Sequence, residues 1–430
     1  GLGPVRFDAF GIGLGVDGAE PSTVLAVVAA PDDRDTGATC FNDPEFLMRM
    51  VDADDGTVMT GPALVEDLER AATIHAVNMF HVGHLDEALL CLDLAHATAL
   101  CGEMERARGK YLMAAATLDS LIERLVESDG GRSIADEIET MVASCPGIDP
   151  DLRITNAAVA VVDRHCDRLA ELLDQLAAQH EAETGFASLD GTLGGGDSAP
   201  PPVGGELLDL GLLPPRLIRF TGHDDNDLIF RLVDDQIVEA SAVLRSALLA
   251  DSTDTDGVFL VAADSFSGEL ISSAPCTVSG MHLSARLWLA DATLSETHFL
   301  LVASTVPLSR VHADPVAVRA ARIDRACRSA WTQHRRAVTL AALITSTDDG
   351  ESFDRARDQM DMLTAESASL CAGALTALAG HRDESDPAAD TIYRQYIEGV
   401  QRLATAVSTH NGGEGPQRAT LAELCAEAGW

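Results

Sequence analysis

Two short stretches carry residues that could do chemistry, and the first is the glycine-rich segment GIGLGVDG at residues 11–18. Its Gly13, Gly15 and Gly18 have the G-x-G-x-x-G spacing that lets a backbone approach a pyrophosphate. That chemistry needs a helix to begin at once, so that its N–H groups point at the anion. Pro21 would lie inside such a helix, and the STVLAVVAA that follows is typical of a strand. We therefore expect a glycine turn between two strands and no bound cofactor.

The second stretch, TIHAVNMFHVGHLDEALLCLDLAHATALCGE at residues 73–103, is rich in histidine and cysteine. His81, His84 and Cys91 are its candidate metal ligands, because residues seven apart share a face of a helix and zinc or iron binds imidazole and thiolate. The spacing is not H-E-x-x-H, however, and Gly83 between the histidines suggests that a helix starts there instead. The pattern favours ordinary buried or surface histidines, and the three residues remain weak candidates.

Lysine chemistry is nearly absent from this chain. Lys110 is the only lysine among the 30 basic side chains, and it lies in the helical run EMERARGKYLMAAA. Class I aldolases, pyridoxal phosphate enzymes, P-loop NTPases and protein kinases each need a lysine in a defined loop or strand context. The sequence argues against all four classes.

The nine cysteines are odd in number and form no C-x-x-C pair. Several fall at apolar positions of helical patterns, which is typical of reduced, buried thiols rather than of a disulfide framework or a zinc ribbon. We expect a reducing compartment such as the cytoplasm, or a virion.

The charge balance is strongly acidic, with 68 acidic and 30 basic residues and a net charge of −38. A protein that reads a nucleic-acid sequence needs clustered Lys and Arg, so sequence-specific binding is not expected. The charge does not exclude a protein that encloses nucleic acid without binding it tightly. Two explanations of the acidity compete: adaptation to high salt, and a GC-rich genome that depletes lysine codons. No run reaches the 18 or so apolar residues of a membrane span, so no membrane insertion is expected.

The elements that must position these residues suggest an α+β fold, predominantly α-helical, with a mixed but mostly antiparallel sheet in the middle. A strand-rich region is expected first, with a hairpin at 49–61, and a helical domain follows with an apolar stripe over 159–176. Next come a Gly/Pro-rich arm, a mixed α/β region and a C-terminal helical domain in about four segments. The expected boundaries are 1–61, 62–184, 185–215, 216–310 and 311–430.

Within the middle region, 216–220, 228–233, 258–263, 277–294 and 297–305 are predicted strands, and 234–250 is predicted to be an amphipathic helix. Ordering the arm costs conformational entropy, so we expect a neighbouring domain or chain to hold it. The leucines of ELLDLGLLPP would supply the apolar anchor.

Together these features favour a structural, self-assembling subunit of a shell or coat, a viral capsid protein in particular, whose partners are copies of itself. The alternative is a soluble metal-dependent enzyme with a His/Cys site in the helical domain. The residues point away from an enzyme without excluding one, because paired carboxylates cannot be located in so acidic a chain.

Overall fold

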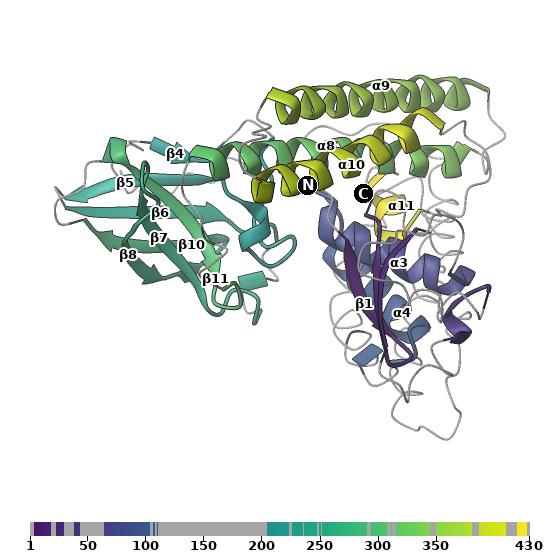
Figure 1. Ribbon diagram of the computed structural model, residues 1–430, viewed down its shortest axis with the longest axis horizontal. Coiled ribbons are helices and arrows are strands. Elements are labelled where there is room, and N and C mark those ends of the chain that lie inside the picture. Colours follow the sequence, from purple (N-terminus) through teal and green to yellow (C-terminus); the bar gives the residue numbers. More distant parts are fainter. Residues whose placement is uncertain are drawn as a thin grey trace, which may run out of the picture. The chain divides into compact units, whose positions relative to one another are not determined.

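The computed structural model holds six α-helices and three antiparallel sheets in the part of the chain that it describes (Figure 1). The α+β class predicted from the sequence is confirmed, while a predominance of helix is not established. The described residues are 4–18, 23–29, 38–43, 64–103, 106–107, 110, 204–222, 226–234, 236–246, 249–250, 252–289, 294–307, 311, 315–344, 350–380, 387–409 and 419–427.

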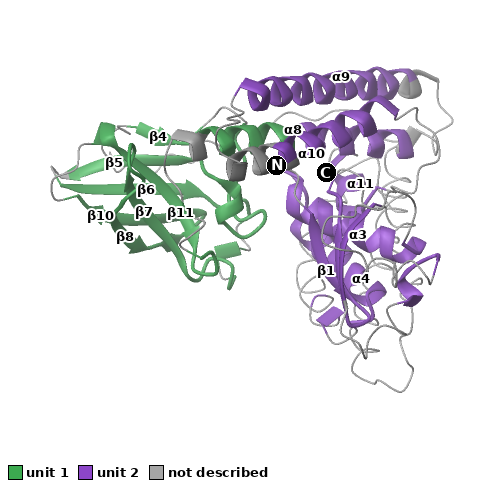
Figure 2. Ribbon diagram, in the orientation of Figure 1, with its two compact units in different colours: residues 1, 186–329 green, residues 2–185, 330–430 purple. Residues whose placement is uncertain are grey.

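The chain divides into two compact units (Figure 2). Unit 1 is formed by residues 186–329 together with residue 1, and unit 2 by residues 2–185 and 330–430. Unit 2 is therefore assembled from the two ends of the sequence. Each unit is described below by itself.

Unit 1 is built on two antiparallel sheets. One has the strand order β4-β5-β6-β10-β9 and the other β11-β7-β8. The strands are β4 (Gly204–Glu206), β5 (Leu228–Asp234), β6 (Ile237–Val243), β7 (Val258–Asp264), β8 (Leu270–Pro275), β9 (Thr277–Ser279), β10 (His282–Trp288) and β11 (Thr297–Ala303).

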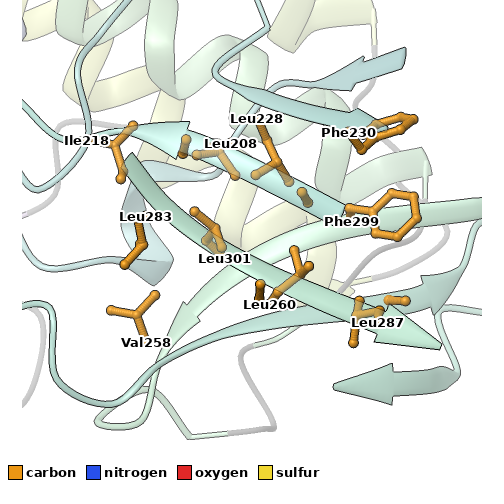
Figure 3. Packing of buried hydrophobic residues seen from close by; sticks show 14 of the residues in the cluster. Leu208, Ile218, Leu228, Phe230, Val258, Leu260, Leu283, Leu287, Phe299 and Leu301 are labelled. Atoms are coloured by element: carbon orange, nitrogen blue, oxygen red, sulfur yellow. The ribbon is translucent and has the colours of Figure 1, made fainter. Parts of the chain in front are cut away.

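The two sheets pack face to face over one apolar core (Figure 3). Alternate residues of each strand point into it, for example Leu228 and Phe230 of β5, and the rings of Phe230 and Phe299 lie 4.9 Å apart. Strands β7 and β11 are also covered on their other face, where Val261 and Leu300 belong to a second apolar cluster. Burial on both faces explains why these strands are continuous apolar runs in the sequence.

Two sequence predictions for this region need correction. Residues 237–243 form strand β6 and not part of a helix, because IVEASAV buries every second residue and pairs with β5 on one side and β10 on the other. Residues 216–220 form no strand, and only Ile218 makes an isolated bridge to Leu244.

The end of the predicted arm belongs to unit 1. Glu206 lies in β4, and Leu208 and Leu213 are part of the core between the sheets. Leu212, in the short 3-10 helix Leu210–Leu212, packs into the second apolar cluster. The leucine anchor therefore docks on strands of its own chain. Residues 185–203 of the arm lie outside the described residues, as do the predicted hairpin at 49–61 and the apolar stripe at 159–176.

Unit 2 begins with a small sheet of order β1-β2-β3 and two helices. Phe7 of β1 stacks on His75 of the first helix at 5.2 Å, which fixes the helix on the sheet. The bounds are β1 (Val5–Ala9), β2 (Ile12–Val16), β3 (Val24–Ala29), α3 (Glu66–Phe80) and α4 (Glu87–Leu100).

The C-terminal region is helical in four segments, as the sequence predicts. They are α8 (Pro315–Ile344), α9 (Gly350–Gly380), α10 (Pro387–Thr409) and α11 (Leu421–Glu427). Helix α8 starts in unit 1 and ends in unit 2. In unit 2 the indole N–H of Trp331 donates to the carbonyl of Gly18 at 2.7 Å, which ties α8 to the N-terminal segment.

Candidate functional site

Most of the glycine-rich stretch at 11–18 forms strand β2 (Ile12–Val16) and not the predicted turn. The turn lies at Phe10 and Gly11, whose φ values of 50° and 83° suit a tight hairpin between β1 and β2. Gly13 and Gly15 lie within β2, and the chain then continues through Gly18 towards β3. The described residues that follow thus form a strand, where a dinucleotide site would need a helix.

Packing accounts for Gly15, and the backbone of Gly18 has a structural contact of its own. A side chain at Gly15 would come within 3.3 Å of Ala26 on the neighbouring strand, beside an irregularity in the β2–β3 register. The carbonyl of Gly18 accepts the hydrogen bond from Trp331 described above. Both positions therefore have a role in the fold, independent of any ligand.

The candidate ligands His81, His84 and Cys91 do not share a helix. Helix α3 ends at Phe80 and α4 begins at Glu87, so both histidines lie in the connecting loop and only Cys91 is helical. The sequence argument that placed His84 and Cys91 on one helical face is wrong, because the N-cap Asp86 starts a new helix by accepting hydrogen bonds from two backbone N–H groups.

Each of the three side chains has its own surroundings. His81 is buried with its ring edge-on to Trp331, His84 is exposed, and the Cys91 thiol donates to the carbonyl of Lys110 at 3.4 Å. Gly83 allows this loop to fold tightly, since a side chain there would lie 2.7 Å from the His81 ring. Among the described residues no three His, Cys, Asp or Glu side chains are placed to hold a metal ion.

Of the other histidines of this stretch, His96 is buried and His75 is half-buried in unit 2. Burial, reinforced by nearby Lys110 and Arg106, lowers the pKa of His75 to about 4. Burial and Arg70 lower the pKa of His96 to about 4 as well. Both rings are therefore neutral at pH 7, and they pack as part of the helical core.

Five of the seven described cysteines are buried and two are half-buried, and none is in a disulfide. Burial raises the pKa of the Cys40 and Cys371 thiols to about 11 and that of Cys101 to about 12. A raised pKa removes the reactive thiolate at neutral pH. These thiols behave as small apolar side chains.

The densest group of buried charges in the described part of unit 2 surrounds helix α11. Arg335 of α8 makes a bidentate ion pair with Glu423, in which Nε and Nη2 donate to the two carboxylate oxygens at 2.8 and 2.7 Å. Both side chains are 2% exposed. Asp93 of α4 is fully buried and accepts hydrogen bonds from the backbone N–H groups of Leu421 and Ala422. Two segments distant in sequence, α4 and α8, thus converge on the seven residues of α11.

This arrangement separates the pKa values of two carboxylates. Burial raises the pKa of Asp93 to about 6, an effect that Arg70 and the two backbone N–H groups only partly offset. Burial also opposes ionisation of Glu423, but Arg335 outweighs it and lowers the pKa to about 2. Split carboxylate pKa values can mark acid–base catalysis. Here both carboxylates are buried and accept hydrogen bonds from other groups of the protein. We therefore assign this cluster of charges to the docking of α11.

Sequence reasoning missed this cluster, although one local signal was present. Thr420 and Glu423 form a capping box, in which the Thr420 hydroxyl accepts from the N–H of Glu423 and the Glu423 carboxylate accepts from the N–H of Thr420. That pattern predicts a helix start at residue 421. It gives no hint of Asp93 or Arg335.

Comparison of the chain with protein-family models, with curated proteins and with solved structures finds no match.

Proposed function

We propose that the protein is a structural subunit that assembles with copies of itself into a shell or coat, as a viral capsid protein does. The observation that carries this proposal is an exposed helix face without charge. Residues 367–380 of α9 include no Asp, Glu, Lys or Arg, in a chain with 98 such residues among its 430. Depletion of charge is a feature of the centre of protein interfaces.

The two sides of α9 differ in exposure. Leu363, Ser367, Cys371, Ala374 and Leu378 are buried, and Ser367 donates to the carbonyl of Ala330 on α8 at 2.7 Å. Within residues 367–380 the opposite side is exposed and consists of small side chains: Ala368, Ser369, Ala372, Gly373, Thr376, Ala379 and Gly380. Small side chains allow two helix backbones to approach closely.

The expectation that no stretch reaches membrane length needs correction. By length and composition, α9 could cross a bilayer within Asp354–Gly380, since an 18-residue window of this range has a mean hydropathy of 1.3, and 28% of that window is buried. The sequence estimate missed it because 13 of the 27 residues of Asp354–Gly380 are Ala, Ser, Gly or Thr. These residues gain little from transfer to lipid compared with Leu or Phe. We therefore favour a helix of another copy as the partner of this face.

Sedimentation of the full chain across a range of salt tests the proposal. A net charge of −38 opposes association, so we expect assembly to tighten as the screening length falls from about 30 Å at 0.01 M salt to about 3 Å at 1 M. A chain that sediments as a monomer at every salt concentration would contradict the proposal.

A matched pair of variants localises the effect on α9. Ala372→Glu places a carboxylate on the uncharged face and should weaken assembly at least tenfold. Gln359→Glu adds the same charge at an exposed position of the charged half of the helix and should leave assembly within about twofold of wild type. Equal losses in the two variants would show that net charge, and not this face, controls association.

A further inference from the structure

The outer face of the larger sheet of unit 1 carries an exposed tryptophan. Trp288, at the end of β10, is 58% exposed, whereas Trp331 in unit 2 is 1% exposed. Tryptophan is highly buried on average, because its indole has a large apolar surface. The indole N–H of Trp288 donates to Oε1 of Gln236 at 3.1 Å, which restrains the ring. A restrained ring loses little conformational entropy on binding, so it is a ready platform for a ligand.

Polar side chains lie beside this ring in a regular array. Alternate residues of β6 and β10 point into the core between the sheets, so the remaining residues of these strands lie on the outer face. These outer residues are exposed or half-buried. Opposite one another across the two strands stand Trp288 and Ile237, Arg286 and Glu239, and Ser284 and Ser241.

The charges in the row next to Trp288 nearly cancel. The Nε–H of Arg286 donates to a carboxylate oxygen of Glu239 at 2.6 Å, and the Arg286 side chain is 67% exposed. Arg231 of β5 lies opposite Glu239 on its other side. Two arginines and one glutamate give the row a net charge of only +1. The row is therefore a set of hydrogen-bond donors and acceptors rather than a strongly charged patch.

We propose that this outer face of β6 and β10 binds a neutral oligosaccharide. The C–H face of a pyranose ring is apolar and stacks on an indole, while its hydroxyl groups both donate and accept hydrogen bonds. Residues two apart on a strand are roughly 7 Å apart, so a sugar ring on Trp288 brings the next ring over Arg286 and Glu239. There the guanidinium donates to one hydroxyl and the carboxylate accepts from another. The proposal is independent of self-assembly.

The charge of the chain favours a neutral ligand over a charged or an apolar one. A polyanion such as single-stranded nucleic acid needs several cations along its backbone, and a chain of −38 repels it. An apolar surface would remove the Arg286–Glu239 pair from water without replacing the lost hydrogen bonds. The hydroxyl groups of a sugar replace the water around these charges with hydrogen bonds of their own.

The first test presents the full chain with immobilised neutral oligosaccharides of glucose, mannose, galactose and N-acetylglucosamine, beside a single-stranded thymidine oligonucleotide. We expect at least one neutral oligosaccharide to retain the chain. The same oligosaccharide in solution should shift the tryptophan fluorescence, and its Kd should change less than about twofold between 0.15 M and 1 M salt, because no ion pair forms with the ligand. Retention by none of the neutral oligosaccharides would overturn the proposal.

The second test locates the site with variants. Trp288→Ala removes the platform and should weaken oligosaccharide binding at least tenfold, and Arg286→Gln should weaken it at least threefold. Phe266→Ala is the matched control, since it removes a 78% exposed aromatic ring from the turn between β7 and β8, in the other sheet. The control should bind within about twofold of wild type, and urea unfolding checks the fold of each variant. Wild-type binding by Trp288→Ala would overturn the proposed site.

Two further outcomes would assign this face to a different partner. Binding of the thymidine oligonucleotide that depends on Trp288 and falls steeply with salt, without oligosaccharide binding, would make it a nucleic-acid surface. Loss of self-association in Trp288→Ala, again without oligosaccharide binding, would make it a contact between copies. Either result overturns the oligosaccharide proposal. A chain that binds the oligosaccharide through Trp288 but stays monomeric at every salt concentration would overturn self-assembly alone.

Discussion

The core between the sheets of unit 1 and the docking site of α11 in unit 2 are stabilised by opposite means. The first is a cluster of apolar side chains such as Leu260 and Phe299, and a buried ion pair, Arg325–Asp227, lies beside it, where Asp227 accepts from the N–H of Leu208. The second relies on Asp93, Arg335 and Glu423, all of them buried. Burial of apolar surface depends little on direction or pH, whereas a buried ion pair depends on both.

This difference bears on how precisely each region fixes the position of its elements. An apolar core tolerates changes among apolar side chains, provided that its total volume and pattern are kept. A short helix such as α11 has little area to bury, so its position must come from directional bonds. Asp93 and Arg335 act at its first turn, and Arg336 pairs with Glu427 at its last residue. We infer that the charged groups set the register of α11.

The largest expected effect is the loss of one partner from the buried ion pair. Arg335→Met would leave the Glu423 carboxylate buried without a cation, and we expect about 3–5 kcal/mol of destabilisation at pH 7. Adding Glu423→Gln to this variant should recover part of the loss. Urea unfolding followed by circular dichroism and tryptophan fluorescence measures both values.

Leu260→Ala in the apolar core of unit 1 serves as the control. It should cost about 2–5 kcal/mol through the cavity it leaves, and that cost should be the same at pH 5 and pH 7. If Arg335→Met were as mild as a surface change, the ion pair would have no role in docking α11.

An intermediate effect is expected for Asp93, and it should appear as a pH dependence. Burial raises the folded-state pKa of Asp93 from 3.8 to about 6, so between these values the folded chain binds more protons than the unfolded chain. The contribution of Asp93 to the unfolding free energy therefore falls as pH rises from 4 to 6. Asp93→Asn removes this slope, and the variant should gain roughly 2–3 kcal/mol relative to wild type between pH 4 and pH 7.

Urea titrations of both proteins at several pH values measure this change. The constant offset from altered hydrogen bonding cancels in the comparison. A difference between variant and wild type that does not vary with pH would show that Asp93 is ionised as readily in the folded chain as in the unfolded one.

Much of the fold was predictable because it is local. The strands at 258–264 and 297–303 are continuous runs of apolar and β-branched residues, and the C-terminal helices are separated by clusters of Gly, Asp and Ser. The prediction of a helix was wrong at 237–243, where Glu239 and two alanines are residues that favour helices. Pairing with β5 and β10 overrode that preference, since strand propensity depends on neighbours that the local sequence does not show.

The α11 site was not predictable for a different reason. Asp93 and Leu421 are 328 positions apart in sequence, and each acidic residue is one of 68. No spacing rule connects such residues, because only the packing of α4, α8 and α11 brings them together. The two-unit division has the same origin, since unit 2 joins residues 2–185 to residues 330–430.

The smallest effect is expected for an ion pair of the same chemistry on the surface of unit 1. Arg286 of β10 lies opposite Glu239 of β6, and its Nε is 2.6 Å from a carboxylate oxygen of Glu239. The side chains are 67% and 30% exposed, so water screens the attraction that burial strengthens around Arg335. Arg286→Gln should therefore change the unfolding free energy by less than about 1 kcal/mol, and 1 M salt should remove most of that change. Urea unfolding at low and high salt, beside Arg335→Met, provides the comparison. A loss above about 2 kcal/mol that persists in high salt would mean that burial is not what distinguishes the two pairs.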